Sequence, residues 1–358
     1  MITYLFNYNK RTLKAYKQLI SSTPPRVTVE SNLDKRDTSL QIGIMDPTIG
    51  TANQGDFIIK DAISKQLLSI LPNSFITNYP SQLHRGIDTV LQQRKSEDLM
   101  FVAGTNLLSS NMNQYYQWKV GPLDAAFLKN RYILFGVGWW QYQDTPNSYT
   151  RWLYQNVLST KYSHAVRDSY AKNKLEEAGI KNVINTSCPT LWDLTKERCM
   201  AIPTKKATDV VTTLTFYHKD PQKDKFLLDE LLKSYQTVYL WIQGFNDLGY
   251  LHELGYKDEN RIQLIEPTLQ AFDEALKEND IDYVGTRLHA GVRALQHGRR
   301  TMIVAVDNRA LEISRDTNLN VVPRTEVERI QNFTASDYKT QINLPQANID
   351  LWKSQFLN

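Results

Sequence analysis

Short apolar runs alternate with helical repeats along most of this chain. The segments "DLMFVAGT" (residues 98–105) and "RYILFGVG" (131–138) are almost continuously hydrophobic and end in or next to glycine, as expected of strands buried on both faces. Between such runs, segments such as "GDFIIKDAISKQLLSIL" (55–71) carry apolar residues at helical spacing. Strands that alternate with helices imply parallel sheets with right-handed crossovers. The sequence therefore predicts an α/β fold in which helices flank parallel sheets.

A charged segment without clear periodicity, residues 193–209, interrupts the alternation once. Strand-like runs and helical repeats resume with "VVTTLTFY" (210–217) and continue to "RTMIVAVD" (300–307). A chain of 358 residues is long enough for two domains with separate cores. We therefore predict two Rossmann-like domains that face a cleft. They comprise residues 1–195 with an N-terminal arm over 1–37, a linker over 196–208, and residues 209–358, which end in a helix.

The composition is that of a soluble globular protein, with 41% hydrophobic and 22% charged residues. The net charge of +4 is compatible with anionic ligands but too small to indicate nucleic acid, which we do not expect as a partner. Cys188 and Cys199 are expected to be reduced thiols in a cytoplasmic protein. No apolar run approaches the roughly 20 residues that cross a bilayer. The basic start "NKRTLKAYKQL" is predicted to be a docked surface helix, with peripheral contact at the inner face of the membrane as the alternative.

The segment "DYVGTRLHAGVRALQHG" (282–298) places an arginine and a histidine where a strand turns into a helix. Arg287 and His289 thus lie at a helix N-terminus, whose free N–H groups favour an anion. Arg167 also follows a strand, and in open parallel sheets ligands bind beyond the carboxyl ends of the strands. Guanidinium groups suit phosphate and carboxylate, and imidazole titrates near neutral pH. We therefore predict an anion site between the domains, with Arg287 and Arg167 binding the anion and His289 transferring a proton. The alternatives are surface ion pairs for the arginines and a helix cap for the histidine.

Further polar residues and a glycine follow other strands. Asn53 and Asp56 lie in "GTANQGDFII", where they either bind a polar substrate or form a turn and a helix cap. Gly104 follows the run "LMFVA", and Gln243 lies in "IQGFND". We predict that these four residues position the substrate. The chain carries neither a Rossmann fingerprint nor a Walker motif, and we expect no cofactor and no obligatory metal.

Several of these segments resemble the polysaccharide pyruvyl transferase family. The similarity is carried by "NQGDFII", "DLMFVAGTNLL", "ILFGVG", "AVRDSYAKNKLEEAGI", "SCPTLW" and above all "VGTRLHAGVRALQHGRRTMIVAVDN". It extends over about residues 41–320, which is most of the chain. One departure is "AGTN" at Gly104, where such proteins usually carry a run of glycines.

The resemblance implies a glycosyltransferase-B-like pair of domains and phosphoenolpyruvate as the donor, bound by the C-terminal domain. Arg287 and His289 of the R-x-H element, together with Arg167 of the "VRD" element, would act on this donor. The expected reaction forms a pyruvate ketal on a sugar of an exopolysaccharide, a capsule or a cell-wall glycopolymer, or on a precursor that is free, nucleotide-linked or lipid-linked. The alternatives are a sugar-nucleotide-dependent glycosyltransferase of the same architecture and a non-catalytic binding protein.

Overall fold

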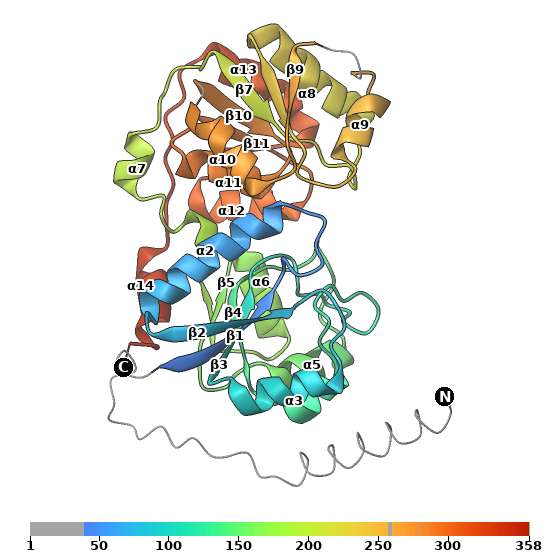
Figure 1. The fold of residues 1–358 in the computed structure, drawn as a ribbon, viewed down its shortest axis with the longest axis vertical. Coiled ribbons are helices and arrows are strands. Elements are labelled where there is room, and N and C mark those ends of the chain that lie inside the picture. The colour runs from blue at the N-terminus through green and yellow to red at the C-terminus, as the bar shows by residue number, and fades with distance from the viewer. Residues whose placement is uncertain (1–38, 257–259, 279, 358) are drawn as a thin grey trace.

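Two α/β domains lie one above the other along the long axis of the molecule (Figure 1). The computed structural model describes residues 39–256, 260–278 and 280–357, so the predicted N-terminal arm with its basic start lies outside the described residues. Each domain is built on a sheet of six parallel strands, which confirms the predicted pair of Rossmann-like domains. Within the described residues, no helix combines the length and the apolar character needed to cross a membrane.

The N-terminal sheet has the strand order β2-β1-β3-β4-β5-β6, and every neighbouring pair is parallel. All residues of β3 and β4 are buried, which explains their continuous hydrophobic runs. The strands are β1 (Leu40–Asp46), β2 (Ser74–Pro80), β3 (Leu99–Ala103), β4 (Tyr132–Val137), β5 (His164–Val166) and β6 (Val183–Asn185). The helices between them are α2 (Gly55–Ile70), α3 (Ile87–Ser96), α4 (Pro122–Phe127), α5 (Ser148–Val157) and α6 (Ser169–Glu177).

The C-terminal sheet has the order β12-β11-β10-β7-β8-β9, again with parallel neighbours. Counted from β7, this is the Rossmann order 3-2-1-4-5-6. The strands are β7 (Asp209–Thr212), β8 (Val238–Trp241), β9 (Ile262–Ile265), β10 (Ile281–Gly285), β11 (Thr301–Ala305) and β12 (Val321–Pro323). The helices are α8 (Pro221–Ser234), α9 (Asp247–Glu253), α10 (Leu269–Glu278), α11 (Leu288–Gln296), α12 (Asn308–Thr317), η2 (Arg324–Arg329) and α13 (Ile330–Ala335).

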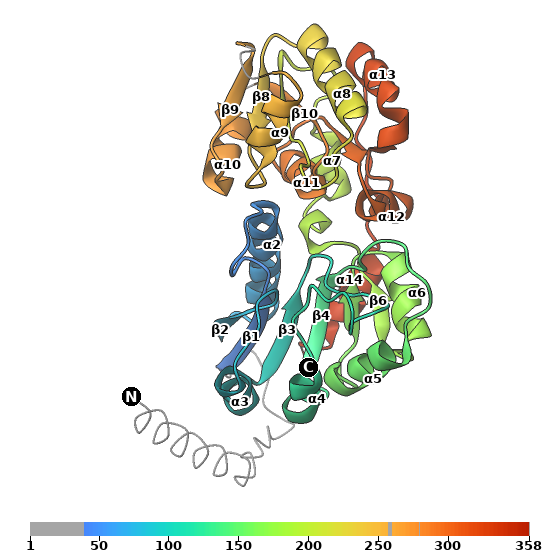
Figure 2. The same cartoon turned by 90° about the vertical axis from the view of Figure 1, so that its right-hand side faces the viewer.

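The carboxyl ends of the two sheets meet at the domain interface. The strand order reverses between β1 and β3 in one domain and between β7 and β10 in the other, and ligands of open sheets bind beyond the strands at such points. The loops after β1 and β8 touch: the Gln54 N–H donates to Gln243 O at 2.9 Å, and Asn53 forms an isolated bridge with Gly244. Helix α2 also contacts α11 across the interface (Figure 2). The fold thus places both candidate ligand-binding edges around one cleft.

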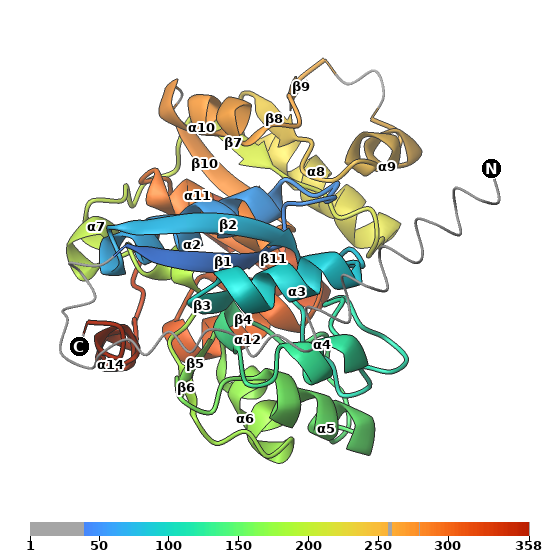
Figure 3. The ribbon, with the colours of Figure 1, turned by 60° about the horizontal axis from the view of Figure 1, so that its bottom comes forward.

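The last helix, α14 (Gln346–Ser354), packs on the N-terminal sheet (Figure 3). Trp352 stacks on Phe135 of β4 with ring centroids 4.4 Å apart, and Phe356 packs edge-on against Phe101 of β3. The prediction that the second domain runs to residue 358 is therefore wrong. The chain crosses back to the first domain because the apolar face of α14 covers side chains of β3 and β4.

The segment predicted to be the linker follows a short 3-10 helix, η1 (Pro189–Leu191), and itself contains the short helix α7 (Lys196–Met200). Cys199 and Ile202 are buried among apolar side chains of the C-terminal domain. The backbone N–H of Tyr338 donates to Thr204 O at 2.8 Å, so the outward and the returning crossing run side by side (Figure 1).

Candidate functional site

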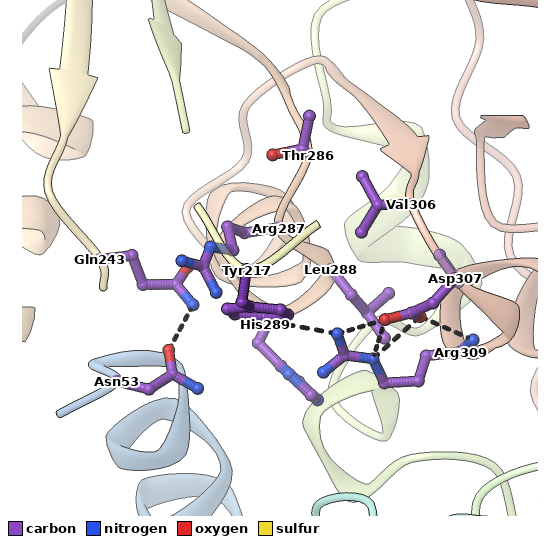
Figure 4. Close-up of a pocket in the computed structure, with 11 residues that line it drawn as sticks. Asn53, Tyr217, Gln243, Thr286, Arg287, Leu288, His289, Val306, Asp307 and Arg309 are labelled. Carbon is purple, nitrogen blue, oxygen red and sulfur yellow. Dashed lines mark hydrogen bonds and ion pairs between the residues drawn. The ribbon is translucent and has the colours of Figure 1, made fainter. Parts of the chain in front are cut away.

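A small pocket lies at the carboxyl ends of the C-terminal strands, where the loop after β1 borders it (Figure 4). Four of the predicted site residues, Asn53, Gln243, Arg287 and His289, line this pocket. Its complete lining is Asn53, Tyr217, Gln243, Thr286, Arg287, Leu288, His289, Val306, Asp307, Arg309 and Ala310.

Arg287 is the N-cap of α11, and its side chain is 3% exposed. Nη2 donates to both carboxylate oxygens of Asp247, at 2.8 and 3.0 Å, and Nε donates to Leu214 O at 2.8 Å. Gly244 leaves room for the guanidinium, because a Cβ there would lie 2.5 Å from Nη2. Nη1 is buried and has no partner within the described structure. The guanidinium is therefore held by protein groups on one edge and carries an unpaired donor on the other, as an anion-binding arginine requires.

His289 is the second residue of α11 and is 8% exposed. Its Nε2 lies 3.8 Å from Cys188 Sγ. Burial lowers the pKa of His289 to about 3, and the positive charges of Arg167 and Arg309 act in the same direction. The imidazole is therefore neutral at physiological pH in this structure. A bound anion would oppose the two guanidinium charges and raise this pKa.

Arg167 follows β5 in the N-terminal domain and is 1% exposed. Nε donates to Asp168 Oδ2 at 3.3 Å, and Nη1 is buried without a partner in the described part of the chain. Arg167 does not line the pocket, but its charge lowers the pKa values of His289 and Asp307, which do. The structure thus brings Arg167 close to His289 from the opposite domain.

The turn after β3 contains the "AGTN" sequence. Gly104 has φ +42° and lies against Ile59 of α2, where a Cβ would clash. This packing explains the glycine, and its contact with a substrate stays a prediction. Asn106 accepts a hydrogen bond from Arg167 Nη2 through its side-chain oxygen. The residue that departs from the family's glycine run therefore helps to orient Arg167.

Among the pocket residues that sequence reasoning missed, three are titratable: Tyr217, Asp307 and Arg309. Asp307 caps α12 and accepts from Arg309 Nε at 2.9 and 2.8 Å, and Arg309 Nη2 donates to Tyr217 OH at 3.1 Å. Burial would raise the pKa of Asp307, but Arg309 outweighs it and lowers the pKa to about 2. Burial would also raise the pKa of Tyr217, but the charges of Arg309 and Arg287 lower it below its ordinary value. These residues follow β7 and β11, so the strand-end rule that selected Arg287 could have found them.

Asn53 and Gln243 join the two domains at the edge of the pocket. Gln243 Nε2 donates to Asn53 Oδ1 at 2.8 Å, and the same oxygen accepts from the Gly55 N–H at 3.1 Å. Gln243 Oε1 is buried and lacks a partner among the described residues. The two side chains thus lie where substrate-positioning residues were predicted, but they already bind each other.

Asp56 lies in the first turn of α2 and is 4% exposed. Thr51 Oγ1 donates to its Oδ2 at 2.6 Å. Burial raises the pKa of Asp56 to about 6, although this hydrogen bond and the charges of Arg309 and Arg287 act in the opposite direction. A carboxyl group that titrates near neutral pH therefore lies within the field of two arginines of the other domain.

Comparison with solved structures places this fold in the glycosyltransferase-B-like class. The UDP-GlcNAc 2-epimerase of Methanocaldococcus jannaschii, solved in complex with UDP-GlcNAc and UDP, is 12% identical with a TM-score of 0.51, over 89% of this chain and 98% of that chain. The E. coli heptosyltransferase WaaC, solved with ADP, is 10% identical with a TM-score of 0.36, over 82% and 100% of the two chains. At these identities the similarity concerns the fold alone, and the assignment of the fold rests on the epimerase.

The family follows from a different comparison. The model of the polysaccharide pyruvyl transferase family matches residues 53–308, which is most of the chain. The protein therefore belongs to the polysaccharide pyruvyl transferase family and is a transferase. No protein of curated function matches the sequence.

Proposed function

We propose that this protein transfers the enolpyruvyl group of phosphoenolpyruvate to a sugar of a surface or extracellular polysaccharide, or of its precursor, and forms a pyruvate ketal. The observation that supports the proposal most is the pair of buried, unpartnered Nη1 atoms on Arg167 and Arg287, which come from opposite domains within the described structure. A buried donor without a partner costs free energy, so two such donors beside His289 favour an anionic ligand with two charged groups.

The donor meets this requirement because it carries a carboxylate and a phosphate. We assign one guanidinium to each anion and the free N–H groups at the start of α11 to the phosphate. Asp247 and Asp168 hold the two guanidinium groups in place from the far side. Arg309, which lines the same pocket, adds a third positive charge near the phosphate.

The reaction needs a proton at the methylene carbon of the donor. His289 is the proposed proton donor: the negative charge of the bound donor raises the pKa of its buried imidazole and so favours the imidazolium form. The methylene carbon becomes a methyl group while a sugar hydroxyl attacks the adjacent carbon and loses its own proton. A second hydroxyl then displaces the phosphate, which leaves with the electron pair of the broken bond and takes up the proton that this hydroxyl loses. The guanidinium groups stabilise the charge of the departing phosphate.

The acceptor side is assigned to the loop after β1 and the start of α2. The carboxylate of Asp56 would accept a hydrogen bond from the attacking hydroxyl, and Asn53 with Gln243 would fix the sugar at the edge of the pocket. The scheme uses phosphoenolpyruvate as a co-substrate and requires neither a cofactor nor an obligatory metal. We place the reaction in the cytoplasm, at or near the inner face of the membrane, with a free or lipid-linked glycan as the acceptor.

A donor screen tests the proposal. The purified protein is incubated with candidate glycans and either phosphoenolpyruvate or a UDP- or GDP-sugar. Phosphate release and product mass are then measured. We expect phosphate release from phosphoenolpyruvate and a product heavier by pyruvate less water, and neither with Arg167→Ala. Release of UDP or GDP without consumption of phosphoenolpyruvate would show that the protein is a sugar-nucleotide glycosyltransferase instead.

A further inference from the structure

A second, larger cavity adjoins the donor pocket. Its volume is about 640 Å³, and it shares Val306 and Asp307 with the donor pocket. The loops after β7, β11 and β12 form most of its wall, and Gln141 with Tyr142 of the N-terminal domain completes it. A molecule in this cavity would therefore lie beside the bound donor, separated from it by the side chain of Asp307.

Arg324 supplies a buried positive charge to the cavity. Its side chain is 11% exposed, and its acidic partner, Asp224, is 3.7 Å from Nη1. Nε and Nη2 are buried and have no partner in the part of the chain that the structure describes. The single long ion pair thus leaves two nitrogens of the guanidinium without a hydrogen bond.

The charged side chains that line the cavity are Lys219, Asp220, Asp307 and Arg324. His218 also lines it, and burial lowers the pKa of this histidine. Asp307 acts in the opposite direction, but the charges of Arg309, Arg324 and Arg287 lower the pKa further. The arginines around the cavity therefore favour a ligand that brings negative charge of its own.

Asn308 supplies an unpaired acceptor to the same cavity. It is the first residue of α12, is 6% exposed, and its Oδ1 is buried without a partner among the described residues. An amide oxygen accepts a hydrogen bond from a hydroxyl group. The cavity thus offers unpaired donors on Arg324 and an unpaired acceptor on Asn308, which suits a sugar that carries an anionic group.

We infer that this cavity binds a second sugar of the acceptor, next to the sugar that Asn53 and Gln243 are assigned to fix, and that this second sugar carries a phosphate or a carboxylate. Arg324 binds this anionic group, and Asn308 accepts a hydrogen bond from a hydroxyl of the same sugar. The identification of the bound molecule as the acceptor rests on the proposed function. Its anionic character rests on the unpaired guanidinium nitrogens of Arg324.

The first test measures binding. Calorimetry compares hexose 1-phosphates, methyl hexuronides and neutral methyl hexosides on the wild type and on Arg324→Gln, with and without saturating phosphoenolpyruvate. We expect one charged class to bind the wild type about tenfold more tightly than the neutral sugars, or more, and Arg324→Gln to remove that advantage. The class with the advantage shows whether the anion is a phosphate or a carboxylate. Arg329→Gln is the control, because it removes a 58% exposed charge from the same helix η2.

The second test separates the two proposals. Arg324→Gln should keep the affinity for phosphoenolpyruvate within twofold of wild type and raise KM for the charged acceptor far more than it lowers kcat, and Arg324→Lys should restore part of the loss. Equal affinities of wild type for charged and neutral sugars, or an equal loss for both in Arg324→Gln, would overturn the inference. If wild type binds the charged sugars through Arg324 but does not bind phosphoenolpyruvate, the inference stands and the donor assignment fails.

Discussion

Replacement of Asp56 by asparagine should stabilise the protein at high pH while it impairs turnover. Burial raises the pKa of Asp56 to about 6 in the folded protein, against an ordinary value of 3.8. Ionisation of this carboxyl is therefore unfavourable in the folded state, and stability is lost as the pH rises from about 4 to above 6. Each unit of difference between the folded and the ordinary pKa corresponds to about 1.4 kcal/mol. Above pH 7 the ionised Asp56 therefore lowers the free energy of unfolding by about 3 kcal/mol, and Asp56→Asn avoids this loss.

Urea unfolding of wild type and Asp56→Asn at several pH values measures the effect. The variant should be more stable by about 3 kcal/mol at pH 8, with a smaller gain at pH 5 and almost none at pH 4. Asp88→Asn is the matched control, because Asp88 also lies in the first turn of a helix but is exposed. A gain that is independent of pH, or a loss of stability at pH 8, would refute the reasoning. In wild type, kcat should fall as the pH drops through about 6, where Asp56 becomes protonated. The residual activity of Asp56→Asn should show no such fall.

Three other substitutions test the donor site and the fold. His289→Gln should lower kcat by about 10²–10⁴-fold with little change in phosphoenolpyruvate affinity, and steady-state rates within threefold of wild type would contradict its role in proton transfer. Arg287→Ala should weaken phosphoenolpyruvate binding in calorimetry by about tenfold or more, with only partial recovery in Arg287→Lys. Burial raises the pKa of Asp247, and the positive charge of Arg287 opposes this. Without Arg287 the ionisation of Asp247 is less favourable in the folded protein, so Arg287→Ala should lose more stability at pH 8 than at pH 5 in unfolding curves. Trp352→Ala should cost about 3–5 kcal/mol in urea unfolding, whereas Leu351→Ala, at a 61% exposed position of the same helix, should cost little.

The sequence signals were strongest where burial was most complete. The strands β3 and β4 are buried along their whole length, so they read as apolar runs. β2 escaped notice because it lies at the edge of its sheet and buries only one of its residues, Tyr79. The helical period of α14 predicted a helix but could not say which sheet it covers, since periodicity gives a helix an apolar face without naming its partner.

The candidate site shows the same division between local and long-range information. Arg287 and His289 were found because a strand end and a helix start are adjacent in the sequence. The hydrogen bond between Asn53 and Gln243 joins residues 190 positions apart, so it depends on how the two domains dock and left no local pattern. The role of Asn106 toward Arg167 was likewise hidden, because only the fold brings the turn after β3 next to the end of β5.

The paired crossings between the domains have a mechanical consequence. The outward segment and the returning segment are joined at Thr204 and Tyr338, so the domains are tethered at two neighbouring points. Such a double tether permits rotation about an axis through the pair, whereas sliding or twisting of one domain on the other would stretch one of the segments. A protease cut in one crossing would leave the halves connected through the other. Rotation about this axis would widen the cleft most on the side away from the crossings, and we expect a bulky glycan to enter from that side.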